Sequence, residues 1–255
     1  MKHVFFIAML ATLAVLACQN APGPAVAQAP AAPEARRDTF PAGDLDYLMG
    51  KFDPATRPNF VKVGRPYTDK AGMMLRQEAF EAFERMWKAA QKDGISLKII
   101  SSTRTFEQQK GIWEGKWTRF AAETPEPDKR ALRILEYSAM PGVSRHHWGT
   151  DIDLNDLNNP SFEGKGAHKK VYDWLVEHAH EYGFCQPYTA LSEPHRTGYH
   201  EEKWHWSYTP LSRDFLNQYL NLVNDNMIAG FSGAELAPGL HIVENYAAGI
   251  NTACK

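Results

Sequence analysis

Histidines and acidic residues gather in two short segments of the 255-residue chain. The first reads Ser-Arg-His-His-Trp-Gly-Thr-Asp-Ile-Asp over residues 144–153, and the second reads Glu-Lys-Trp-His over residues 202–205. His146 and Asp153 are seven positions apart, so they can share one metal ion if the chain turns between them. Gly149 supplies backbone freedom for that turn, and imidazole and carboxylate are ordinary zinc ligands. The first segment therefore indicates two ligands of a metal site.

The second segment offers a further ligand and an acid–base group. His205 would complete a set of three protein ligands with one position left open, as a catalytic zinc requires. Glu202 precedes it by three residues, so it can lie beside a water molecule at the open position without binding the metal. A carboxylate placed there can take the water's proton and later deliver it to a leaving amine. This arrangement indicates hydrolysis of an amide bond.

Residues 101–109 add an arginine at the end of an expected strand. They read Ser-Ser-Thr-Arg-Thr-Phe-Glu-Gln-Gln. The guanidinium of Arg104 could stabilise the oxyanion that forms when water attacks a carbonyl, or bind a carboxylate through two hydrogen bonds. Two alternatives stay open at this point: Arg145 as the arginine of the site, and Asp151 as the aspartate ligand.

In combination and in this order, the segments resemble the zinc D-alanyl-D-alanine carboxypeptidases and dipeptidases of the VanY type. That family shows Ser-x-x-Arg with a Gln five residues further on, then Ser-x-His-x-x-Gly-x-x-x-Asp, then Glu-x-Trp-His. The matching residues are Ser101, Arg104 and Gln109, then Ser144, His146, Gly149 and Asp153, and finally Glu202, Trp204 and His205. The resemblance spans about residues 70–210.

The resemblance implies the roles of the residues at the reaction centre. It implies one zinc ion per chain, held by His146, Asp153 and His205. Glu202 would be the general base and acid, and Arg104 would be the partner of the carbonyl and the oxyanion.

The resemblance also implies substrate-binding residues and shows one departure. Ser144 and Arg104 are implied at the substrate, with Gln109 chiefly as a support. Many relatives carry a small apolar residue two positions before the ligand aspartate, where this chain has Asp151. The departure leaves the expected metal site intact but puts the details of substrate preference in question.

The implied function is hydrolysis of the terminal D-Ala-D-Ala bond of peptidoglycan stem peptides by a D,D-carboxypeptidase. Alternatives with the same chemistry are a D,D-dipeptidase and a peptidoglycan endopeptidase. A rival of another class is a non-catalytic lipoprotein that binds cell wall and holds a structural metal, although structural zinc usually has four protein ligands. With 28 Lys and Arg against 30 Asp and Glu, the chain has no basic excess for nucleic acid. We expect a monomer.

The elements that must position these residues belong to one expected domain, residues 43–255. Apolar periodicity predicts helices over 71–92, 106–120, 128–136, 169–182 and 211–223, and strands over 95–101, 151–154 and 204–208. Helices and short strands do not alternate regularly, which favours an α+β fold over a doubly wound sheet. We expect a small antiparallel sheet flanked by helices, with the zinc site at the sheet edge.

The N-terminal residues are typical of an export signal rather than of the fold. Residues 1–17 contain an apolar run of 14 residues, shorter than the roughly 20 that a spanning helix needs, so we interpret them as a signal peptide. The run ends Val-Leu-Ala before Cys18, which resembles a lipoprotein cleavage box. Residues 18–42 would then be the lipid-attachment cysteine and an Ala/Pro-rich tether. Cleavage after Ala27 and a retained anchor are the alternatives.

This reading places the protein in the cell envelope, facing the periplasm or cell wall and membrane-bound only through the lipid. In such an oxidising compartment Cys185 and Cys254 could form a disulfide that fixes the C-terminal tail. Three further histidines near the motifs, His147, His195 and His200, are expected at packing or surface positions.

Overall fold

The computed structural model describes Met1 and residues 44–255. The expected signal peptide, Cys18 and the tether therefore lie outside the described residues. None of the helices in residues 44–255 combines the length and the apolar character that crossing a membrane would need.

Two antiparallel sheets form the β structure of this domain. The larger has four strands in the order β3–β4–β6–β5, and the smaller pairs β1 with β2. The bounds are β1 Phe60–Val63, β2 Met73–Arg76, β3 Ile99–Ser101, β4 Asp151–Leu154, β5 Phe184–Cys185 and β6 His205–Tyr208. In the register of the central pair, Asp153 stands directly opposite His205. Two candidate ligands are thus cross-strand neighbours.

Each central strand places its apolar residues on one face and its polar residues on the other, because side chains alternate along a strand. On β4, Ile152 and Leu154 are fully buried in a hydrophobic cluster, which Trp206 and Tyr208 of β6 join. The opposite face carries the polar residues of both strands, which are Asp151, Asp153, His205 and Ser207. The packing of the apolar face therefore fixes where the polar side chains point.

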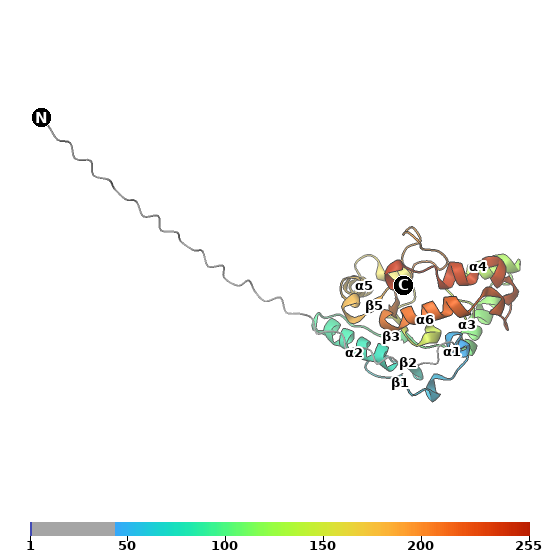
Figure 1. The fold of residues 1–255 in the computed structure, drawn as a ribbon, viewed down its shortest axis with the longest axis horizontal. Helices are drawn as coiled ribbons and strands as arrows, with labels where there is room; N and C mark the ends of the chain where they lie inside the picture. The colour runs from blue at the N-terminus through green and yellow to red at the C-terminus, as the bar shows by residue number, and fades with distance from the viewer. Residues whose placement is uncertain (2–43) are drawn as a thin grey trace. The chain divides into compact units, whose positions relative to one another are not determined.

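The helices are α1 Leu45–Leu48, α2 Gln77–Lys92, α3 Phe106–Arg119, α4 Pro127–Leu135, α5 Ala167–His178, α6 Thr209–Leu222 and α7 Ala237–Leu240. Residues of α2 and α5 share the hydrophobic cluster on the apolar face of the larger sheet. Figure 1 shows α2 and α5 toward one end of the domain, and α3 and α4 toward the other. The expected mixture of helices and a small antiparallel sheet in one domain is confirmed.

One expected helix is wrong in its first part. The helix predicted over 71–92 begins only at Gln77, and Met73–Arg76 is strand β2. There Met73 and Leu75 are buried while Met74 is less so, which is the period of two of a strand. In so short a segment this pattern is hard to distinguish from the apolar pattern of a helix. Pairing with strand β1, which the apolar pattern does not predict, makes this segment a strand rather than the start of the helix.

The C-terminal tail is joined to the sheet. Cys185 of β5 forms a disulfide with Cys254, with their Cα atoms 5.7 Å apart. Cys254 ends a short 3-10 turn, Thr252–Cys254. The two cysteines are 69 positions apart, and the bond closes a loop that includes β6 and α6.

Candidate metal and catalytic site

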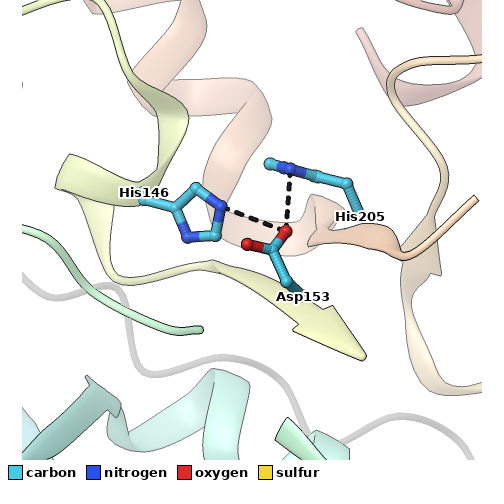
Figure 2. Close-up of side chains that lie close together, drawn as sticks. All are labelled: His146, Asp153 and His205. Atoms are coloured by element: carbon cyan, nitrogen blue, oxygen red, sulfur yellow. Dashed lines mark ion pairs between the residues drawn. The ribbon is translucent and has the colours of Figure 1, made fainter. Parts of the chain in front are cut away.

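His146, Asp153 and His205 converge at one end of the two central strands (Figure 2). Asp153 Oδ1 lies 3.3 Å from His146 Nε2 and 3.2 Å from His205 Nδ1. The three possible ligand atoms all lie within 4.8 Å of one another, and all three residues are buried. The cluster thus lies at the ends of the two central strands, β4 and β6, and not on an edge strand of the sheet.

A tight turn brings His146 back over the strand that follows it. Residues Arg145–Trp148 form a 3-10 turn that ends at Gly149, whose φ of +74° lies in the left-handed region. A Cβ atom at Gly149 would lie 2.4 Å from a ring carbon of Phe60. Glycine is therefore required here both for its backbone conformation and for space, and it provides the reversal that the seven-residue spacing of the ligands needs.

The facing atoms of this cluster fit a shared cation. His146 Nδ1 lies 2.8 Å from the carbonyl oxygen of Ser102, to which it can donate, so its Nε2 is free to act as a ligand. Neither that Nε2 nor Asp153 Oδ1 has a hydrogen-bond partner among the described residues, although both atoms are buried. Buried polar atoms are rarely left this way. Two imidazole nitrogens and a carboxylate oxygen form a donor set that suits zinc.

Charges around the cluster favour a cation at the same point. Burial and the nearby Arg104 lower the pKa of His146, which keeps its imidazole in the neutral form that binds metals. Although burial lowers the pKa of His205, the carboxylates of Asp151, Asp153 and Glu202 that face its ring raise it well above its ordinary value. Three carboxylates therefore surround one imidazole and attract positive charge there.

Glu202 lies beside the cluster in the position expected for an acid–base group. Its Oε2 is 3.2 Å from His205 Nδ1, and the residue is 6% exposed. Burial raises the pKa of Glu202. Its backbone N–H donates to the carbonyl oxygen of Tyr188, which fixes the segment before β6.

Arg104 reaches the cluster from the segment between β3 and α3. Its Nη1 donates to Ser101 Oγ at 3.1 Å and lies 3.9 Å from Asp153 Oδ2. Its backbone N–H donates to the carbonyl oxygen of His146. Thr105 then begins α3 with a capping box, so the start of the helix and the turn Arg145–Trp148 hold the arginine between them.

A cleft of about 350 Å³ opens over these residues. All the catalytic, metal-binding and substrate-binding residues predicted from the sequence line it, namely Arg104, Gln109, Ser144, His146, Asp153, Glu202 and His205. Gln109 Nε2 also donates to the carbonyl oxygen of Ala139 at 2.8 Å, which joins α3 to the chain that leads into the turn Arg145–Trp148.

A family model described as VanY, D-alanyl-D-alanine carboxypeptidase, matches residues 72–211, which is more than half of the chain. The chain belongs to the VanY family. The match contains β3, β4, β6 and the complete candidate site.

Individual relatives agree with this assignment. A putative carboxypeptidase YodJ of Bacillus subtilis (strain 168) is 31% identical over 136 residues, covering 52% of this chain and 46% of the relative. A D-alanyl-D-alanine carboxypeptidase of Enterococcus faecalis is 29% identical over 126 residues, covering 48% and 44%. The matches thus span less than half the length of these relatives. The solved LdcB LD-carboxypeptidase shares 23% identity and a TM-score of 0.50, with 68% of this chain and 77% of that chain covered, and it supports the fold.

The VanY patterns do not include several residues that complete the cleft. These are Ile112, Lys116, Tyr137, Ser138, Ala139, Leu157, Tyr188 and Tyr199. Helical spacing could have indicated part of the set, because Gln109, Ile112 and Lys116 of α3 lie at positions i, i+3 and i+7. The others come from segments remote in sequence, so no local pattern connects them.

Lys116 brings a second cation into the cleft. Its Nζ donates to Ser138 Oγ at 2.5 Å, and it makes no ion pair with any residue of the described part of the chain. Burial lowers the pKa of Lys116, as do Arg119 and Arg104, while Glu202 opposes them. Because no carboxylate of the described residues pairs with it, the Lys116 amine is available to an anionic ligand.

The alternative residues lie elsewhere. Asp151 and Arg145 pair with each other behind His205 rather than lining the cleft, so neither replaces the VanY residue it was weighed against. His147 is buried, and its Nδ1 donates to the carbonyl oxygen of Arg104 at 2.7 Å. His200 packs edge-on against Tyr137 outside the cleft lining, and His195 is exposed.

Proposed function

We propose that the protein is a zinc-dependent D,D-carboxypeptidase that hydrolyses the D-Ala-D-Ala bond of peptidoglycan stem peptides. The observation that carries this proposal is the convergence of His146, Asp153 and His205 within 4.8 Å, with Glu202 adjacent in a chain of the VanY family. Three protein ligands and a neighbouring carboxylate are the arrangement of a catalytic zinc rather than a structural one.

The proposed mechanism assigns proton transfer to Glu202. A zinc ion held by the three ligands would supply Lewis acidity toward the scissile carbonyl and toward a water molecule. Glu202 would accept a proton as the water oxygen bonds to the carbonyl carbon, and return it to the amine nitrogen as the C–N bond breaks. Arg104 would donate hydrogen bonds to the oxyanion. Burial, which raises the pKa of Glu202, favours a carboxyl group that can both take and give a proton.

The cleft supports a substrate that ends in a free carboxylate. Arg104 and Lys116 both line it, together with the hydroxyl groups of Ser144 and Ser138. A volume of about 350 Å³ suits the end of a short peptide, and the cationic side attracts its carboxylate. This favours a carboxypeptidase over an endopeptidase, whose substrate continues beyond the cut bond without that charge. We assign substrate binding to Ser144, Arg104 and Gln109.

We also propose export to the cell envelope through residues 1–17, with lipid attachment at Cys18 and a tether to residue 42. The disulfide between Cys185 and Cys254 agrees with an oxidising compartment. A Cys18→Ser variant should leave the membrane fraction and appear in the soluble fraction. Unchanged fractionation would exclude the lipid anchor. We propose that the protein acts as a monomer.

The reaction is tested with Glu202→Gln in an assay of D-Ala release from a pentapeptide that ends in D-Ala-D-Ala. The variant should retain zinc but lose about a thousandfold in kcat, because no group accepts the proton. Glu201→Gln is a matched control, since Glu201 pairs with Lys203 and does not line the cleft. Full activity of Glu202→Gln would contradict the mechanism, and a zinc-loaded wild type that releases no D-Ala would favour the binding lipoprotein.

A further inference from the structure

Asp151 forms a buried hydrogen-bond array directly behind one of the proposed ligands. The residue is 0% exposed. Its Oδ2 lies 2.9 Å from His205 Nε2 and 2.9 Å from Arg145 Nε. Its Oδ1 accepts hydrogen bonds from Thr150 Oγ1 at 2.7 Å and from Ser207 Oγ at 2.8 Å. Both carboxylate oxygens are thus fully used.

Arg145 balances this buried charge. It is 1% exposed, donates from Nη2 to Ser207 Oγ at 2.6 Å, and lies over the ring of Trp148 at 4.8 Å. An unpaired carboxylate at this depth would be strongly destabilising, whereas a paired and hydrogen-bonded one is tolerated. Asp151 Oδ2 is therefore shared between a buried cation, Arg145, and the imidazole of His205.

The two proposed histidine ligands are fixed in different ways. His146 faces the neutral carbonyl oxygen of Ser102 through Nδ1 and presents Nε2 to Asp153. His205 faces the carboxylate of Asp151 through Nε2 and presents Nδ1 to Asp153 and Glu202. A half-turn of the His205 ring would exchange its nitrogens for carbons at both points, and the contact with Asp151 opposes that rotation.

We propose that Asp151, charge-balanced by Arg145, is a positioning residue that orients His205 as a metal ligand. It holds Nε2–H of the imidazole so that the Nδ1 lone pair is directed into the cluster, and its charge makes that nitrogen a stronger donor. Carboxylate partners of this kind typically contribute about 10–100-fold to metal affinity. The inference deepens the proposed function and rests on its metal site.

The test measures zinc affinity, by competition with a chromogenic chelator, in two double variants. Asp151→Ala with Arg145→Met removes the hydrogen bond and leaves no unpaired buried charge, so the fold should persist. Its zinc affinity should fall by about 10–100-fold. Asp151→Asn with Arg145→Met keeps an acceptor for Nε2–H and should lose less. Ser212→Ala is the matched control, because the Ser212 hydroxyl hydrogen-bonds Ser207 at the far side of the array rather than Asp151 or His205, and its affinity should equal that of wild type.

Zinc affinity unchanged in the Asp151→Ala, Arg145→Met variant would overturn the inference and leave the pair a purely structural ion pair. Equal losses in the two double variants would also overturn the orienting role, because charge alone would then explain them. Failure of the proposed function gives a different result. In that case wild type binds zinc, and the variants weaken the binding as expected, but no D-Ala is released.

Discussion

The floor and the wall of the cleft differ in how deeply their side chains are buried and how firmly they are held. The floor is the polar face of β4 and β6 with the turn Arg145–Trp148, and the wall is α3 with residues 137–139. Floor side chains are buried, and Asp151 holds His205 and Ser207 by hydrogen bonds. On the wall, Ile112 is 37% exposed and Tyr137 is 44% exposed, and Lys116 has one hydrogen bond. The buried floor therefore provides fixed geometry for the reaction, whereas the more exposed wall provides adaptable contacts for binding.

Charge divides along the same line. Asp153 and Glu202 make the floor acidic, which suits a cation. Lys116 and Arg104 make the opposite side basic, which suits an anionic end of a substrate. If the two regions act separately, substitutions on the floor should change kcat and metal binding, and substitutions on the wall should change KM.

Arg104 lies outside both regions as defined but reaches the floor, because its Nη1 donates to Ser101 Oγ and lies 3.9 Å from Asp153 Oδ2. Its substitution therefore tests to which region it belongs in function. Arg104→Met should lower kcat/KM by about 10²–10³-fold through loss of the oxyanion donor, with zinc content unchanged. The measurement is steady-state release of D-Ala together with metal analysis. An increase in KM with unchanged kcat would assign Arg104 to substrate binding, like the wall residues, and would exclude it from oxyanion stabilisation.

Substitution of Lys116 tests whether the wall binds the carboxylate of the substrate. Lys116→Met should raise KM about tenfold for a peptide with a free C-terminal carboxylate, equivalent to about 1.4 kcal/mol, and leave kcat nearly unchanged. The same peptide with a C-terminal amide should bind wild type and variant alike. Lys110→Met, on the same helix but not in the cleft lining, is the control. A fall in kcat with unchanged KM would contradict the division into floor and wall.

Sequence reasoning reached the floor more fully than the wall for a physical reason. His146, Gly149 and Asp153 belong to one turn and the strand after it, so their spacing alone restricts where the side chains can meet. Lys116 and Ser138 are 22 residues apart and meet only through packing of α3 on the segment after α4. Likewise β2 is a strand because β1 pairs with it, and that pairing is not visible in the local pattern.

Asp151 shows that the contacts of a residue can stay hidden from the sequence even when the residue lies inside a recognised motif. Its position two residues before Asp153 predicts the same face of the strand. The pairing of β4 with β6, which sets Asp151 opposite Ser207, is what places it against His205 and Arg145. The residue type was visible in the sequence, and its partner was not.

His147 joins the turn Arg145–Trp148 to Arg104 and Gly142, and its substitution gives the smallest expected effect. Its Nδ1 donates to the carbonyl oxygen of Arg104, and its Nε2 accepts from the backbone N–H of Gly142. Both nitrogens are satisfied only in the neutral ring, because a proton on Nε2 would face another donor. Burial lowers the pKa of His147 to about 3.

The folded state therefore resists protonation of His147 where the unfolded state, with an ordinary pKa of about 6.5, accepts it. The contribution to stability is complete above about pH 6.5 and is lost as pH falls toward 3, by at most about 1.4 kcal/mol per pH unit. Unfolding by urea between pH 7 and pH 4, with EDTA present to remove metal effects, should show a shallower acid dependence in His147→Gln than in wild type. Gln keeps a donor and an acceptor but does not titrate, so parallel curves would mean that the neutral imidazole of His147 does not contribute to the acid dependence of stability.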